Sequence, residues 1–117
     1  MIRRGDGAQK SLPAASLHIV LALLDGELHG YAVMQRVAEL SDGAVKMGPG
    51  TLYGTLNRLV ADGLVVETTD RADRDEPERR RYYELSASGR SVALVELARL
   101  RTLVDRVSRT LGGGALA

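Results

Sequence analysis

The sequence predicts a mainly helical (α+β) protein with three helices, a two-stranded hairpin and one long final helix. Two observations lead to this fold class. Apolar residues recur at helical spacing in four segments, and the spacing changes to two between about residues 64 and 85. The 117 residues include four Tyr but no Phe or Trp. The core must therefore be built from aliphatic side chains, which suits packed helices.

The first helix is expected over about 13–24, because Pro13 is preset for a first helical turn and Asp25-Gly26-Glu27 ends the apolar run. Its side chains are apolar nearly all round. Such a helix must be covered on both sides. A small domain can achieve this by lending one side to a second subunit.

Two further helices are expected over about 30–41 and 48–62. The second helix stops at Asp42-Gly43, and Gly63 ends the third as a left-handed cap. The predicted inner stripe of the second helix consists of Val33, Met34, Val37, Ala38 and Leu40.

The third helix has two faces of different kinds. Small or hydrogen-bonding side chains on the outer face would let its backbone approach a DNA groove while still reaching phosphates and base edges. An ordinary solvated helix would more often carry several Glu and Lys there. The expected inner face is Leu52, Leu56, Leu59 and Val60, and the outer face is Gly50, Thr51, Gly54, Asn57, Arg58 and Ala61.

Alternation predicts strands over about 64–69 and 80–85, joined by a charged loop that projects as a solvated wing. Ser86 caps a last helix over about 87–111, which Gly112 ends. This order is that of a winged helix-turn-helix with an added C-terminal helix. The expected parts are a flexible basic arm (1–12), a winged DNA-binding domain (13–86), a dimerisation helix (87–111) and a disordered tail (112–117).

The last helix carries a heptad seam, which predicts pairing with a second subunit through the first and last helices. The alternative is that the helix folds back on its own domain. The predicted dimerisation residues are Leu17, Val20, Leu21, Leu24, Ala93, Leu97, Leu100, Val104, Val107 and Leu111.

Contacts to double-stranded DNA are expected from the third helix, the residue before it and the base of the wing. Arg58 suits guanine or a phosphate and Asn57 suits adenine, and the sequence does not choose between these readouts. The alternative for Tyr53 is a half-buried ring packed against the second helix. The predicted contact residues are Lys46, Thr51, Tyr53, Thr55, Asn57, Arg58, Arg79, Arg80 and Arg81.

Six motifs stand in a fixed order: Leu28-His29-Gly30-Tyr31, Pro49-Gly50-Thr51-Leu52-Tyr53, Leu56 with Arg58-Leu59, Asp62-Gly63-Leu64-Val65, Arg81-Tyr82-Tyr83 with Leu85, and Ser88-Gly89-Arg90. Together they resemble the PadR family of transcriptional regulators over about residues 17–90. Three features depart from that family: Gly48 stands where Ser is frequent, Gly54 where Pro is common, and Glu76-Pro77-Glu78 where a Gly-Arg-Pro type of wing is frequent.

The resemblance implies a homodimeric repressor that binds a palindromic operator. It also implies a small-molecule effector, bound between the subunits of some members. The last helix has no aromatic residue. A direct aromatic sandwich is therefore not expected, and aliphatic pockets between the first and last helices stay open.

The sequence argues against other classes of function. There is no Cys, and His18 and His29 are the only histidines, so no metal site is expected. His29 is expected to order the turn before the second helix. No catalytic constellation or phosphate loop appears, so no enzyme activity and no cofactor are expected.

No apolar run reaches the roughly 20 residues of a membrane span, and no signal-peptide cleavage site follows the basic start. A cytoplasmic protein is expected. The net charge of +1 and the acidic wing leave open an alternative, a winged-helix module that binds a protein partner instead of DNA.

Overall fold

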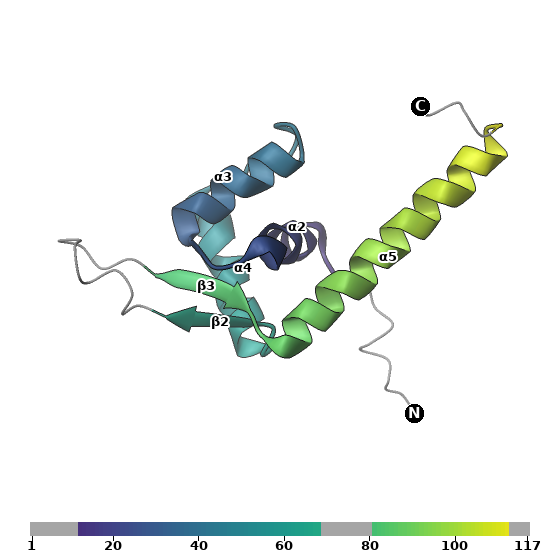
Figure 1. Ribbon diagram of the computed structural model, residues 1–117. Helices are drawn as coiled ribbons and strands as arrows, with labels where there is room; N and C mark the ends of the chain where they lie inside the picture. Colours follow the sequence, from purple (N-terminus) through teal and green to yellow (C-terminus); the bar gives the residue numbers. More distant parts are fainter. Residues whose placement is uncertain (1–11, 69–80, 113–117) are drawn as a thin grey trace.

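The structure is a computed structural model that describes residues 12–68 and 81–112. It confirms the predicted fold class, mainly helical with a small antiparallel sheet and a long last helix (Figure 1). The elements are α2 (Ala14–Ala22), the 3₁₀ turn η1 (Leu23–Asp25), β1 (Leu28–His29), α3 (Gly30–Leu40), α4 (Pro49–Ala61), β2 (Val65–Thr68), β3 (Tyr82–Leu85) and α5 (Ala87–Thr110).

Helix α2 lies in the middle of the molecule and contacts α3, α4 and α5. Ile19 and Val20 are fully buried there, while Leu17, Leu21 and Leu24 stay half-buried. Much of the cover that this apolar helix needs therefore comes from its own chain. The core consists of Ile19, Val20, Ala22, Leu23, Val33, Val37, Leu52, Leu56, Leu59, Val65, Tyr83 and Ala93.

The sheet has three strands in the order β1-β3-β2, all antiparallel. The two predicted strands are present, and β1 is an addition that the sequence did not indicate. It pairs Leu28 with Tyr83 and His29 with Tyr82. The central strand β3 thus joins the start of α3 to the hairpin. The predicted wing loop lies outside the described residues.

The C-terminal end of α4 is tied to the start of α5. Gly63 has φ +79°, as predicted for a left-handed cap. The Ser86 N–H donates to the Leu64 carbonyl at 3.0 Å, and the Ser86 hydroxyl donates to the Gly63 carbonyl. Gly89 then packs on Leu64 so closely that an added Cβ would overlap the Leu64 carbonyl. The end of one helix and the beginning of the other therefore form a single rigid joint.

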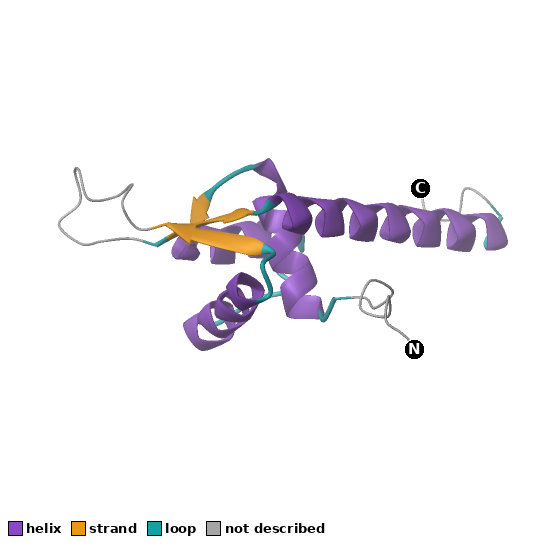
Figure 2. Cartoon of the chain, turned by 90° about the horizontal axis from the view of Figure 1, so that it is seen from below, coloured by secondary structure: helices purple, strands orange, loops and turns teal. Residues whose placement is uncertain are grey.

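Helix α5 leaves the body of the molecule, and its second half extends beyond every other described element (Figure 2). Leu103, Val104, Val107 and Leu111 are exposed on this part of the helix. Ala93, in the first half, is fully buried in the core. One predicted inner residue was wrong: Leu40 is 49% exposed, because it ends α3 on the flank of the helix.

Candidate nucleic-acid interface

Helix α4 separates its residues as the sequence predicted. Leu52, Leu56 and Leu59 are buried against the core. The residues of the predicted outer face are all exposed, namely Gly50, Thr51, Gly54, Asn57, Arg58 and Ala61. This face carries one guanidinium, one amide and one hydroxyl, and its other residues are Gly or Ala. Few side-chain atoms would therefore keep another molecule away from the helix backbone.

The glycines of this face are not required by the fold. A Cβ on Gly48, Gly50 or Gly54 would meet no atom within 4 Å, and none of the three has a positive φ. Gly54 lies inside α4, where glycine costs about 1 kcal/mol relative to alanine. No contact among the described residues explains a glycine at this position.

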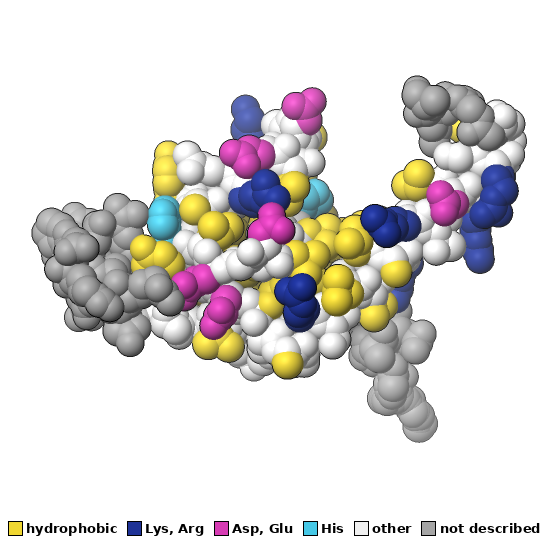
Figure 3. Space-filling model, viewed as in Figure 1, with side chains coloured by type: hydrophobic (Ala, Val, Ile, Leu, Met, Phe, Trp, Pro, Cys, Tyr) yellow, Lys and Arg dark blue, Asp and Glu magenta, His cyan; other side chains and the backbone are white. Residues whose placement is uncertain are grey.

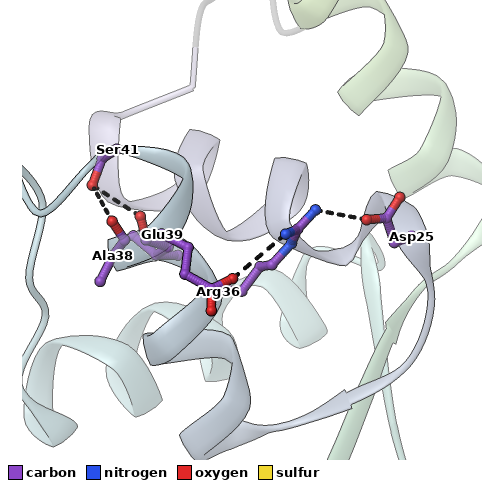
Figure 4. Close-up of polar contacts among 6 residues, drawn as sticks. Asp25, Arg36, Ala38, Glu39 and Ser41 are labelled. Atoms are coloured by element: carbon purple, nitrogen blue, oxygen red, sulfur yellow. Dashed lines mark hydrogen bonds and ion pairs between the residues drawn. The ribbon is translucent and has the colours of Figure 1, made fainter.

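The turn that leads into α4 is held by side chains. The Ser41 hydroxyl donates to the Val37 carbonyl and accepts from the Val45 N–H, both at 2.9 Å. Arg36 pairs with Asp25 at 2.7 Å and lies 3.6 Å from Glu39 (Figure 4). These contacts fix α3 against η1 and set the path of the turn, on which the predicted contact residue Lys46 is exposed.

Two predicted contact residues lie on the borders of α4 instead of on its outer face. Tyr53 and Thr55 are each half-buried on opposite flanks. The Tyr53 ring packs against Gly30, the first residue of α3. The sequence allowed this arrangement as the alternative to DNA contact, but it did not identify Gly30 as the partner.

At the wing, Arg81 is the only member of the arginine run within the described residues, since Arg79 and Arg80 lie outside them. It is exposed, and its Nε lies 3.5 Å from the Glu67 carboxylate on the neighbouring strand. Burial raises the pKa of the Tyr83 phenol and the Glu67 carboxylate adds to the rise, while Arg81 partly offsets it. Arg81 is not in hydrogen-bond geometry with that hydroxyl, which is buried without a partner among the described residues.

His29 caps α3, as the sequence predicted for this turn. The Ala32 N–H donates to its Nδ1 at 3.3 Å. Its ring lies parallel to Tyr31 and edge-on to Tyr82, with centroids 6.5 and 5.8 Å away. Neither tyrosine was among the predicted site residues. Tyr82 could not be found from the sequence, because only the pairing of β1 with β3 brings it next to His29.

The described residues contain no group of three or more His, Cys, Asp or Glu side chains placed to hold a metal ion. Within the same residues, no helix has the length and apolar character to cross a membrane.

Comparison with known proteins decides the family. The model of the transcriptional regulator PadR-like family matches residues 20–94, which is more than half of the chain. The chain belongs to this family. The transcriptional regulator Rv3488 of Mycobacterium tuberculosis is 39% identical over 107 residues, covering 86% of this chain and 92% of the relative.

Two solved structures share the fold. A PadR family transcription regulator from Clostridium difficile has a TM-score of 0.70 at 20% identity and covers 86% of this chain and 100% of that one. Bacillus subtilis PadR, crystallised with operator DNA, has a TM-score of 0.64 at 21% identity and covers 74% of this chain and 48% of that one. The family membership makes this PadR-like protein a transcriptional regulator and not an enzyme.

Proposed function

We propose that this protein is a homodimeric repressor that places α4 in the major groove of a palindromic operator. The observation that carries the proposal is the outer face of α4, where Gly50 and Gly54 leave open space that the fold does not need. Close approach of a helix to a groove needs such space. Nothing else in the described chain accounts for two glycines on an exposed helical face.

The DNA contacts divide by position. Thr51, Asn57 and Arg58 project from the exposed face of α4 and would reach base edges or phosphates. Lys46 lies exposed on the turn before the helix and suits a phosphate. Thr55, on the flank, would contact the edge of the groove. Arg81, together with Arg79 and Arg80, is proposed to bind the phosphates beside the wing.

Dimerisation is supported by the apolar surface of α5. Val104 and Leu103 are 54% and 57% exposed on a helix that has left the domain. Leu97 and Leu100 continue the seam toward the body, where Leu17, Leu21 and Leu24 of α2 are half-buried. In Figure 3, hydrophobic side chains gather over the middle of the molecule, where α2 and the first half of α5 lie. The predicted residues Val20 and Ala93 are already buried by their own chain, so we leave them out of the interface.

A gel-shift titration against the promoter region of the protein's own gene tests operator binding. If each subunit neutralises about four phosphates, the logarithm of the affinity should fall with the logarithm of salt concentration at a slope near −7. Operator half-sites should lie about 34 Å apart, one helical turn. A slope near zero, or equal affinity for random DNA, would contradict the proposal and favour a protein partner for α4.

The interface is tested by Val104→Glu with Val107→Glu. Both positions are exposed in the protomer, so the domain should fold while the charged seam cannot pair. We expect monomers in sedimentation that no longer bind the operator. An unchanged dimer would contradict the seam, and the matched surface variant Arg106→Glu should leave the dimer intact.

The remaining parts of the proposal concern regulation. We propose repression in the cytoplasm, and release from the operator by an aliphatic or amphipathic small molecule between α2 and α5, because α5 has no aromatic residue to stack on a flat ligand. A reporter gene under the protein's own promoter, compared with and without the intact gene, distinguishes repression from activation.

A further inference from the structure

The ring of Tyr53 and the residue Gly30 fill the same space. A Cβ on Gly30 would lie 2.7 Å from Cζ and 2.8 Å from Cε1 of the ring, and closer still to the hydroxyl oxygen. Real Cβ contacts essentially never fall below 3.0 Å. Gly30 has no positive φ, so its backbone conformation does not require glycine. The hydroxyl end of the Tyr53 ring occupies the space that a Cβ would take, so a larger residue at position 30 would have to displace the ring.

This contact lies where three elements meet. Gly30 directly follows β1, whose two residues pair with β3. The N-terminal part of α4 is therefore packed against the start of α3, directly after strand β1.

The two ends of α4 are held differently. At the C-terminal end, Leu64 accepts the backbone hydrogen bond from Ser86 and packs on Gly89. At the N-terminal end, Gly48 provides no side-chain cap. The first turn relies on the packing of Leu52 in the core and of Tyr53 on Gly30. The position of the N-terminal end of α4 thus depends on the contact between the end of the Tyr53 ring and Gly30.

We propose that Tyr53 is a positioning residue: its ring, seated on Gly30, sets the angle of α4 against α3, and its hydroxyl makes no contact with DNA. This inference rests on the proposed operator binding. The direct contacts with operator DNA are assigned to Thr51, Asn57 and Arg58, whose side chains lie on the exposed face of α4. The Tyr53 hydroxyl faces Gly30 instead. A change of the ring would then shift three base-reading side chains together.

The first experiment compares Tyr53→Phe with Tyr53→Ala in the full chain. The phenylalanine variant should bind the operator within about twofold of wild type, whereas the alanine variant should lose about tenfold or more, equivalent to 1.4 kcal/mol. Affinity for random DNA should stay nearly constant in both variants, because it depends on phosphate charge. Equal losses in the two variants would show that the hydroxyl and not the ring carries the effect, and would overturn the proposal.

The second experiment is a double-mutant cycle with Gly30→Ala. The added methyl should displace the ring and lower operator affinity about tenfold in the wild-type background, but have little effect in the Tyr53→Ala background. Equal effects in both backgrounds would refute the coupling. Circular dichroism melts accompany each variant. If Gly30→Ala does not fold, the comparison of the two Tyr53 variants decides alone. Failure of the wild-type protein itself to prefer operator over random DNA would instead refute the proposed function.

Discussion

Replacing Gly54 by alanine tests whether α4 approaches another molecule closely. The residue lies inside the helix with an ordinary φ, and its Cβ would meet no atom within 4 Å. Alanine should therefore fit without strain and raise the free energy of unfolding by about 1 kcal/mol, the difference in helix propensity. Part of this gain comes from the lower conformational entropy of the unfolded chain.

Operator affinity should change in the opposite direction. If a groove wall packs against the bare face of α4, the Gly54→Ala methyl group must either push the helix out or deform its partner. We expect a loss of about tenfold or more in affinity, since overpacking of a close interface costs about 1–3 kcal/mol. A more stable protein that binds its operator less well is an outcome that general damage to the fold cannot produce.

The assay pairs chemical denaturation with gel-shift titration at one fixed protein concentration, because dimerisation makes apparent stability depend on concentration. Ala61→Gly is the matched control on the same exposed face: it should lower stability by up to about 1 kcal/mol and leave operator affinity nearly unchanged. Wild-type affinity in the Gly54→Ala variant would refute the close approach of α4 to DNA.

Three further variants test the supports of the site. Gly89→Ala should destabilise the fold by about 2–3 kcal/mol in urea denaturation, because the Leu64 carbonyl blocks the methyl group; a neutral result would mean that the joint between α4 and α5 can open. Ser41→Ala should cost about 1 kcal/mol in the same measurement, since the Val45 N–H loses its acceptor; no change would show that water replaces the hydroxyl. Tyr83→Phe should raise stability by about 1 kcal/mol at neutral pH, because it removes a buried hydroxyl without a partner. The raised pKa of this phenol means that folding favours its protonated form, so wild-type stability should fall as the pH rises above about 10 and the variant should fall less; equal alkaline losses would contradict the assignment.

Most of the fold follows from local rules of the sequence. The spacing of Leu52, Leu56 and Leu59 fixes which face of α4 is buried, because a helix of 3.6 residues per turn brings these positions together. Gly63 and Ser86 mark helix ends through backbone conformation and capping, which depend on a few neighbouring residues. The predicted helix bounds therefore lie within one or two residues of those observed.

The features that the sequence did not reveal depend on residues far apart in the chain. A strand of two residues, such as β1, has no period to detect, and only its pairing with Tyr82 and Tyr83 makes it a strand. The sequence indicates only that Gly30 begins a helix. Its contact with the Tyr53 ring is visible only once α3 and α4 are packed together. Val20 was predicted to face a second subunit, but it is fully buried in the core of its own chain, on a helix that contacts α3, α4 and α5.

The positions of these contacts suggest how the two functions of the chain are connected. The Ser86 and Gly89 joint fixes the end of α4 to the start of α5, so the direction of the proposed dimer helix also sets the direction of the proposed reading helix. The Tyr53 contact packs the other end of α4 against the start of α3. A change in how two α5 helices pack would then move each α4 as a rigid unit and change the distance between the α4 helices of the two subunits. Because operator half-sites have a fixed separation along DNA, such a change in spacing would lower affinity without altering any residue that touches a base.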